Sequence, residues 1–228
     1  MELFELEQTG VRVKWSTVDQ WARPGTVLSD AERVRADRFH FEQDRRRWVA
    51  ARSALRHMLG DYTGDDPAAL VFDVSEFGKP SIHGRSDVHF SLTHSHELIG
   101  LAMSRTGPVG LDCERIEPKI DVVSLSDEIC STAECDLIRS QGSHAAVFFQ
   151  VWTRKEAVLK ASGLGLSYAP KDLTVLPLDD GVPVCIEIRG HGTWRVCSIE
   201  APAGYAAACC LGSQASRCWH GEDSSRLR

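Results

Sequence analysis

Residues 151–160 read Val-Trp-Thr-Arg-Lys-Glu-Ala-Val-Leu-Lys, and this stretch decides the fold around it. Read as a helix together with the residues just before it, it gathers apolar side chains on one side: Val147, Phe148, Val151, Val158 and Leu159. At about 100° per residue, Glu156 lies on the edge of this apolar arc, and Lys160 lies one turn further along the same edge. Lys155 falls within the arc, so its charge must reach water, an anion or a carboxylate.

Two interpretations of this edge stay open on the stretch alone. Glu156 and Lys160 are four residues apart, a spacing typical of an ordinary helix-stabilising ion pair worth about 0.2–0.5 kcal/mol. Alternatively, a carboxylate and an ammonium at the rim of a buried stripe face a cleft. In both cases we expect a helix from about His144 to Ser162, ended by Gly163.

Composition narrows the class of protein. The 228 residues suggest one large domain or two small ones, and 43% of them are apolar and 25% charged. A formal net charge of −6 argues against a general nucleic-acid binder. No apolar run approaches the ~20 residues that span a bilayer, and the acidic start Met-Glu-Leu-Phe-Glu-Leu-Glu is unlike a signal peptide. We expect a cytoplasmic protein without membrane or nucleic-acid partners.

The cysteines follow no metal-binding or disulfide pattern. Eight are scattered without a Cys-x-x-Cys pair, at Cys113, Cys130, Cys135, Cys185, Cys197, Cys209, Cys210 and Cys218. Most have apolar neighbours, where cysteine behaves as a small hydrophobic residue. We therefore expect reduced thiols and no structural metal.

Two helices are predicted in the first third of the chain. Ser29 and Glu32 form a capping box that opens a short helix, and a longer helix follows over about 42–59, with Gly60 as its stop. The longer helix carries three arginines at 45–47. Such a run is either a solvated face or a site for an anion with several phosphates.

Strands follow, separated by polar segments. Strands are expected at 70–74, 87–92 and 97–104, and residues 77–80 (Phe-Gly-Lys-Pro) form a turn. Residues 93–96 (Thr-His-Ser-His) are expected to form a polar loop. Four consecutive hydrogen-bonding side chains between two apolar strands suit a polar ligand.

A further strand near 108–115 carries a pair of carboxylates. Asp112 and Glu114 are two residues apart and share one face, whereas Leu111 and Cys113 share the other. Neighbouring carboxylates repel unless a cation or a proton lies between them. The face is either the solvent side of an edge strand or a Mg²⁺ site, since Mg²⁺ prefers oxygen ligands.

The remainder of the chain repeats the order of helices followed by strands. Ser131 and Glu134 form a second capping box, and later strands are expected near residues 172–176, 184–189, 193–199 and 204–211. A tryptophan precedes Leu-Arg and Leu-Lys pairs on the two long helices, which hints at a duplicated α+β unit. We expect an N-terminal half at 1–106, a C-terminal half at 107–212 with the carboxylate site, and a loose tail at 213–228.

Four ordered stretches resemble one family. They are Phe-Gly-Lys-Pro (77–80), Phe-Ser-Leu-Thr-His-Ser (90–95), Val-Gly-Leu-Asp-Cys-Glu (109–114) and Trp-Thr-Arg-Lys-Glu-Ala-Val-Leu-Lys (152–160). Their order and separations resemble the 4′-phosphopantetheinyl transferases of the longer, two-half type that serves peptide, polyketide and fatty-acid synthases. The resemblance implies an α+β fold in which two similar halves form an intramolecular pseudo-dimer with coenzyme A between them.

The resemblance also implies a reaction and a site. Coenzyme A would give its phosphopantetheine arm to a serine of an acyl, peptidyl or polyketide carrier protein, leaving adenosine 3′,5′-bisphosphate. Because the two halves lie in one chain, we also expect a monomer. The implied residues are Asp112, Glu114 and Glu156 around Mg²⁺ (or Mn²⁺), Lys160 beside the pyrophosphate, and Lys79, Thr93, His94 and Arg47 on coenzyme A. Glu156 is the leading candidate for the base, directly or through metal-bound water.

Three positions depart from the family pattern. Cys113 replaces an aliphatic residue on an inward face, and Thr93 replaces a serine but keeps the hydroxyl. Glu32 falls where a basic phosphate contact is expected, while Arg35 keeps a positive charge nearby.

Two other functions are compatible with the residues. Separated acidic residues plus a lysine also build a Mg²⁺-dependent nuclease, although the negative net charge disfavours it. A non-catalytic carrier- or nucleotide-binding protein on the same fold is the other alternative. Retention of coenzyme A, DNA cleavage and transfer activity would separate the three.

Overall fold

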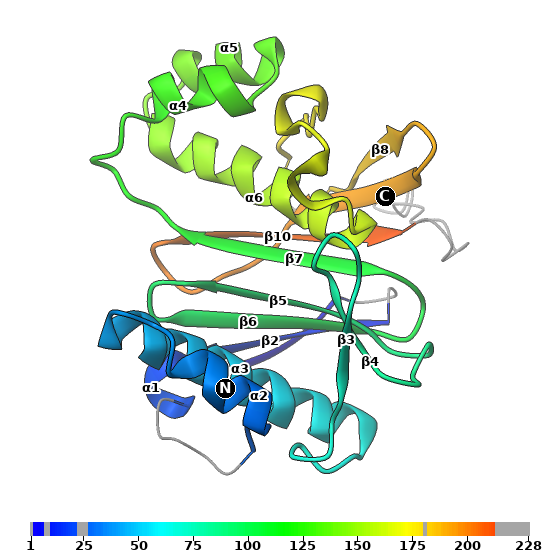
Figure 1. Cartoon of the computed structure of the whole chain (residues 1–228). Coiled ribbons are helices and arrows are strands. Elements are labelled where there is room, and N and C mark those ends of the chain that lie inside the picture. The colour runs from blue at the N-terminus through cyan, green and yellow to red at the C-terminus, as the bar shows by residue number, and fades with distance from the viewer. Residues whose placement is uncertain (1, 7–9, 22–26, 180–181, 213–228) are drawn as a thin grey trace, which may run out of the picture.

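The computed structural model describes residues 2–6, 10–21, 27–179 and 182–212. Two four-stranded sheets lie against each other in the middle of the molecule, and one long helix covers the outer face of each (Figure 1). The predicted α+β class with two similar halves is confirmed. The predicted tail at 213–228, including Cys218, lies outside the described residues.

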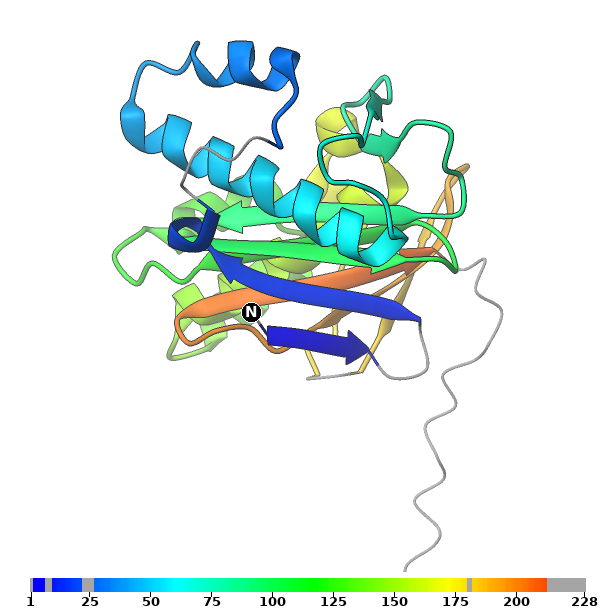
Figure 2. The same cartoon turned by 90° about the horizontal axis from the view of Figure 1, so that it is seen from below.

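The N-terminal half is an antiparallel sheet with the strand order β1-β2-β6-β5. The long helix α3 lies across these strands (Figure 2). The elements are β1 (Glu2–Leu6), β2 (Val11–Thr17), α1 (Val18–Trp21), α2 (Asp30–Ala36), α3 (Glu42–Thr63), β5 (His89–Ser95) and β6 (Leu98–Ser104).

The C-terminal half is an antiparallel sheet with the order β7-β10-β9-β8, covered by α6. Its elements are β7 (Val109–Arg115), α4 (Val122–Ile129), α5 (Thr132–Ser140), α6 (His144–Ser162), the 3-10 turns η1 (Gly165–Ser167) and η2 (Pro170–Asp172), β8 (Val184–Ile188), β9 (Gly192–Ser198) and β10 (Tyr205–Gly212).

Three layers of apolar side chains hold these elements together. One core, which includes Leu55 and Leu101, lies between α3 and the first sheet. A second, which includes Val158 and Val196, lies between α6 and the second sheet. The third joins the inner faces of the two sheets, with contributions from β2, β6, β7 and β10. This third core packs the two halves against each other.

A small hairpin connects the halves at one end of the molecule. It consists of β3 (Phe72–Val74) and β4 (Pro80–Ile82), and its tip reaches the end of α6 (Figure 1). There the Lys79 ammonium donates to the carbonyls of Ala161, at 2.7 Å, and Val109, at 3.4 Å. Because these carbonyls belong to α6 and β7, the hairpin is tied to the opposite half.

Several local predictions are confirmed. Both capping boxes are present, at Ser29 with Glu32 and at Ser131 with Glu134. Helix α6 spans 144–162 as predicted, and Gly163 follows it in the left-handed conformation with φ of 74°. The alternating faces of β7 are also confirmed, since Cys113 is fully buried in the third core.

The predicted stop at Gly60 is wrong. Helix α3 continues to Thr63 and ends at Gly64, which has φ of 80°. Gly60 is instead a point of close approach, because a Cβ there would lie 2.8 Å from the Asp65 carbonyl oxygen and from Pro67 Cγ. A glycine in this helix therefore marks packing against the following loop.

Two predictions about strands are also wrong. Residues 93–95 belong to β5, so the loop is only His96 and Glu97, and His96 has φ of 52°. The predicted strand at 172–176 is absent, since η2 and an irregular segment occupy that region.

Among the described helices, none is both long and apolar enough to cross a membrane. The seven described cysteines form no disulfide bonds with one another.

Candidate active site at the junction of the two halves

The site begins with a close contact between α6 and β7. A Cβ at Gly110 would lie 1.9 Å from the Ala157 carbonyl oxygen and 2.5 Å from the Ala161 amide nitrogen. Only a glycine lets the helix backbone approach the strand so closely. The approach brings Glu156 and Lys160 of α6 beside the carboxylates of β7, next to strand β5 of the other half.

Asp112 is the centre of this cluster and is only 3% exposed. Its Oδ1 accepts hydrogen bonds from Lys160 Nζ at 2.6 Å and from Thr93 Oγ1 at 3.1 Å. Its Oδ2 is buried and has no hydrogen-bonding partner among the described residues. A buried carboxylate oxygen normally needs a partner, so this atom is free to bind a cation.

Glu114 and Glu156 lie half-buried near Asp112. The pKa of Glu156 is raised, first by burial and then by the negative charge of Asp112, against the opposing effect of Lys160. The pKa of Glu114 is raised by burial and Asp112, although a 2.7 Å hydrogen bond from Ser95 Oγ lowers it. These carboxyl groups hold a proton more readily than exposed ones.

Lys160 bonds to strand β7 rather than along its own helix. Its ammonium donates to Asp112 Oδ1 and, at 3.3 Å, to the Leu111 carbonyl. Burial alone would lower its pKa, but the charge and hydrogen bond of Asp112 and the charge of Glu156 raise it. The cleft interpretation of the Glu156 and Lys160 edge is therefore favoured over the simple pair within α6.

The chemistry of this donor set fits a divalent cation. Carboxylate oxygens are the ligands that Mg²⁺ prefers, and Asp112 Oδ2 is buried without a partner. Within the described ranges, no three His, Cys, Asp or Glu side chains are gathered closely enough to form a complete metal cage. Mg²⁺ is commonly held by one or two carboxylates plus phosphates, so a partial protein cage is compatible with it.

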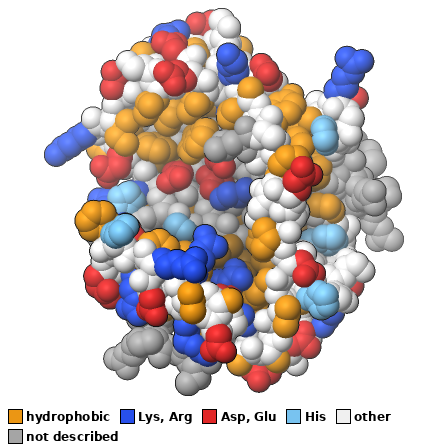
Figure 3. Space-filling view, viewed as in Figure 1, with side chains coloured by type: hydrophobic (Ala, Val, Ile, Leu, Met, Phe, Trp, Pro, Cys, Tyr) orange, Lys and Arg blue, Asp and Glu red, His pale blue; other side chains and the backbone are white. Residues whose placement is uncertain are grey.

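Basic groups lie beside the carboxylates at the end of β5. The pKa of His94 is lowered, first by partial loss of solvent around its ring and then by the positive charges of Lys160 and Arg47. Arg47 pairs with Glu97 at 3.4 Å, and its Nε is buried without a partner among the described residues. Figure 3 shows acidic, basic and histidine side chains together across the middle of this face.

Lys79 lies at another side of the same junction. It lines a pocket of about 300 Å³ with Phe77, Phe90, Leu159 and Lys160. Burial lowers the pKa of Lys79 to about 8. Among the described residues this ammonium bonds to two carbonyl groups, so an anionic ligand would stabilise its charge.

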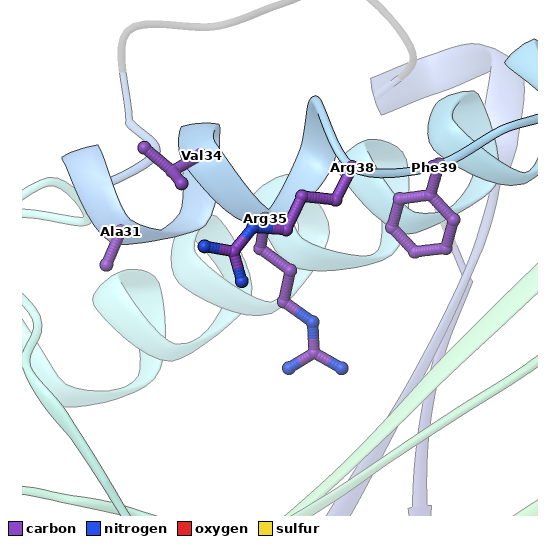
Figure 4. A pocket seen from close by; sticks show the side chains of 5 residues that line it. All are labelled: Ala31, Val34, Arg35, Arg38 and Phe39. Carbon is purple, nitrogen blue, oxygen red and sulfur yellow. The ribbon is translucent and has the colours of Figure 1, made fainter.

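A second hollow, of about 740 Å³, opens beside α2. Arg35 and Arg38 project to the same side of this helix, near Phe39 (Figure 4). Glu32 does not line this hollow. It is 7% exposed, and its carboxylate accepts from Arg56 Nε at 2.7 Å and from Arg52. The departure at Glu32 is thus explained as an internal ion pair that packs α2 on α3.

The opposite side of α6 is anchored in the protein interior. Lys155 is fully buried, and its Nζ lies 2.7 Å from Glu134 Oε2. The same ammonium donates to the carbonyls of Pro170 and Leu173. The sequence left water, an anion or a carboxylate as partners for the Lys155 ammonium, and the structure shows a carboxylate, that of Glu134.

The predicted residues thus surround one junction. Asp112 bonds directly to Lys160 and Thr93, and its charge raises the pKa values of Glu114 and Glu156 nearby. Charges of Lys160 and Arg47 reach His94, and Lys79 lines a pocket with Lys160. Sequence reasoning missed Ser95 and Arg38. The alternation of hydroxyls in β5 would have indicated Ser95, had that segment been read as a strand.

A carboxylate cluster flanked by lysine, arginine and histidine is the kind of site that binds a phosphate ester. Residues 13–106 match the family described as 4′-phosphopantetheinyl transferase, N-terminal, and residues 108–210 match the 4′-phosphopantetheinyl transferase superfamily. The chain belongs to the 4′-phosphopantetheinyl transferase superfamily.

Two sequence relatives agree with this assignment, and one solved structure aligns with part of the chain. The chain is 39% identical over 146 residues to 4′-phosphopantetheinyl transferase HetI of Nostoc sp., across 62% of each protein. It is 31% identical over 177 residues to 4′-phosphopantetheinyl transferase psf-1 of Bacillus pumilus, across 77% of this chain and 71% of that protein. Thermotoga maritima holo-[acyl-carrier-protein] synthase aligns with 46% of this chain and 62% of its own, at 23% identity and a TM-score of 0.38.

Proposed function

We propose that this chain transfers the 4′-phosphopantetheine arm of coenzyme A to a serine hydroxyl of an apo carrier protein in a Mg²⁺-dependent reaction. The products are the holo carrier and adenosine 3′,5′-bisphosphate. The observation that carries the proposal is the convergence of Glu156 and Lys160 of α6 with Asp112 of β7 at the junction of the halves.

Glu156 is the proposed general base. The serine oxygen forms a bond to the β-phosphorus of coenzyme A, and the bond from that phosphorus to the bridging oxygen breaks. Glu156 takes the serine proton, and adenosine 3′,5′-bisphosphate leaves with the bridging oxygen. In the absence of a bound cation, burial and the charge of Asp112 raise the pKa of Glu156, so this carboxylate takes up a proton more readily than an exposed one.

Lys160 stabilises the negative charge that develops on the leaving phosphate. Its pKa is raised by Asp112, so it stays protonated. Asp112, Glu114 and Glu156 would hold Mg²⁺ or Mn²⁺, which supplies neutralisation of the pyrophosphate charge when bound. Phosphoryl transfer depends mainly on such positioning and charge stabilisation.

The basic residues around the cluster are the proposed contacts for coenzyme A. The charges of Lys160 and Arg47 both reach His94, where they add to the effect of burial in lowering its pKa. Arg35 and Arg38 have no acidic partner in the described part of the chain, whereas Arg45 pairs with Asp37. We assign Arg47 and His94 to the 3′-phosphate, and Arg35 replaces the basic contact that Glu32 cannot supply.

The acceptor is proposed to be an acyl, peptidyl or polyketide carrier protein in the cytoplasm. A monomer is the proposed state, because a single chain contains both halves of the junction and the third core that joins them. Lys79 completes the proposed coenzyme A side of the cleft.

Intact-mass spectrometry tests the reaction. The purified protein is incubated with Mg²⁺, coenzyme A and a panel of apo carriers from fatty-acid, polyketide and peptide synthases. At least one carrier should gain one phosphopantetheine, and a chelator should abolish the gain. The absence of any mass gain across the panel would refute the proposal.

Paired ligands test the phosphate contacts. Arg47→Ala and His94→Ala should weaken coenzyme A more than dephospho-coenzyme A, since a charge-assisted hydrogen bond contributes about 1.5–3 kcal/mol. Calorimetric titration measures both ligands. Equal weakening of the two would show that these side chains do not contact the 3′-phosphate.

A further inference from the structure

Three hydroxyl groups of β5 bond to the backbone of β7 across the junction. Ser91, Thr93 and Ser95 alternate along the strand, so their side chains share one face. Their oxygens accept the amide hydrogens of Leu111 at 3.0 Å, Cys113 at 3.2 Å and Arg115 at 3.1 Å. Side chains of one half therefore replace the backbone partners that β7 would have in a continuous sheet.

Two of these hydroxyls make a second bond to a carboxylate. Ser95 Oγ donates to Glu114 Oε2 at 2.7 Å, and Thr93 Oγ1 donates to Asp112 Oδ1 at 3.1 Å. A hydroxyl has one proton to donate. An amide of β7 occupies one lone pair of each oxygen and fixes its position, so the proton is directed at the carboxylate. Cys113 Sγ, at 3.7 Å from Thr93 Oγ1, is a more distant and weaker acceptor than Asp112 Oδ1.

We propose that Thr93 and Ser95 are positioning residues that fix the Asp112 and Glu114 carboxylates for a divalent cation. This inference rests on the proposed function. It assigns a role to Ser95 and places the hydroxyl of Thr93 on a carboxylate rather than on coenzyme A. Each carboxylate is held through one oxygen, and Asp112 Oδ2 is left without a partner among the described residues.

The same bonds make the cation site depend on the assembly of both halves. The carboxylates belong to β7, whereas the hydroxyls that orient them belong to β5. Thr93 and Ser95 are 3% and 7% exposed, so water does not readily replace them as hydrogen-bond donors. Partners that orient metal-binding carboxylates commonly change metal affinity by about 10- to 100-fold when removed.

Ser91 provides a matched control. It accepts an amide of β7 as the other two do and is 6% exposed, but no carboxylate bond accompanies it among the described contacts. Mn²⁺ alone is titrated into the full chain, and the free ion is measured by electron paramagnetic resonance. The variants are Thr93→Val, Ser95→Ala and Ser91→Ala, with Thr93→Ser and Ser95→Thr as conservative replacements.

The dissociation constant for Mn²⁺ should rise about 10- to 100-fold in Thr93→Val and Ser95→Ala and stay unchanged in Ser91→Ala. Thr93→Ser and Ser95→Thr should restore the Mn²⁺ affinity of the parent protein. Urea unfolding should show a similar stability loss in the three variants that lack a hydroxyl, Thr93→Val, Ser95→Ala and Ser91→Ala. Equal Mn²⁺ affinity in Ser95→Ala and Ser91→Ala would overturn the inference while leaving the proposed transfer intact. A parent protein that binds no Mn²⁺ would refute the proposed metal site itself.

Discussion

Lys155→Met should cost a large part of the stability of this protein. Lys155 and Glu134 are both 0% exposed in their side chains, and their charged atoms are 2.7 Å apart. Methionine keeps much of the apolar stem but leaves the Glu134 carboxylate buried without its cation. Removing one partner of a buried ion pair destabilises a protein by about 3–5 kcal/mol.

Hydrogen bonds from this pair to the backbone add to the stability that Lys155→Met should lose. Glu134 also accepts the amides of Ser131 and Val175, and Lys155 donates to the carbonyl of Pro170. The pair thus joins α5, α6 and the 170–175 segment. For a domain of this size, a loss of 3–5 kcal/mol corresponds to a melting temperature lowered by about 6–20 °C.

Urea unfolding followed by circular dichroism measures this loss. Arg139→Met is the matched control, because Arg139 on α5 pairs with Asp127 at the surface. An exposed pair contributes less than about 1 kcal/mol, so the control should change little. Lys155→Met/Glu134→Gln should recover stability relative to Lys155→Met, since no uncompensated charge remains buried. A loss below about 1 kcal/mol in Lys155→Met would refute the reasoning.

Three further predictions concern the junction. Glu156→Gln should lower kcat by about 10²-fold or more in the mass assay while calorimetric affinity for coenzyme A is retained, and near-normal kcat would contradict its role as base. Coenzyme A affinity should fall as pH rises through about 8, where Lys79 loses its proton, and Lys79→Met should abolish this dependence. Gly110→Ala should destabilise the fold by about 1–3 kcal/mol or more, because the new Cβ meets the α6 backbone. Gly142→Ala has open space at its Cβ and serves as the control in urea unfolding.

Local signals in the sequence predicted much of the fold. The apolar arc of α6 and the two capping boxes are confirmed because each depends on residues within one or two turns. The error at 93–95 has a tertiary cause. Hydroxyls in β5 bond to β7 rather than to solvent, so a polar run that resembles a loop is a buried strand.

The sequence predicted which residues belong to the site but not which of them bond to one another. The helical spacing placed Glu156 and Lys160 at one edge, yet the partner of Lys160 is Asp112, 48 residues away in the chain. The same holds for Glu32, whose charge is explained by Arg52 and Arg56 on the next helix. Pairings between elements depend on packing, which residue spacing within one element does not specify.

Two similar sheets in a single chain can change independently over evolutionary time. In an assembly of identical copies, every substitution enters every copy, so one helix would have to serve opposite sides of the site. Here α3 carries the arginines at 45–47, whereas α6 carries Glu156 and Lys160, although each helix lies on a comparable sheet. Substitutions among the arginines of α3 therefore leave the acidic residues of the other half unchanged.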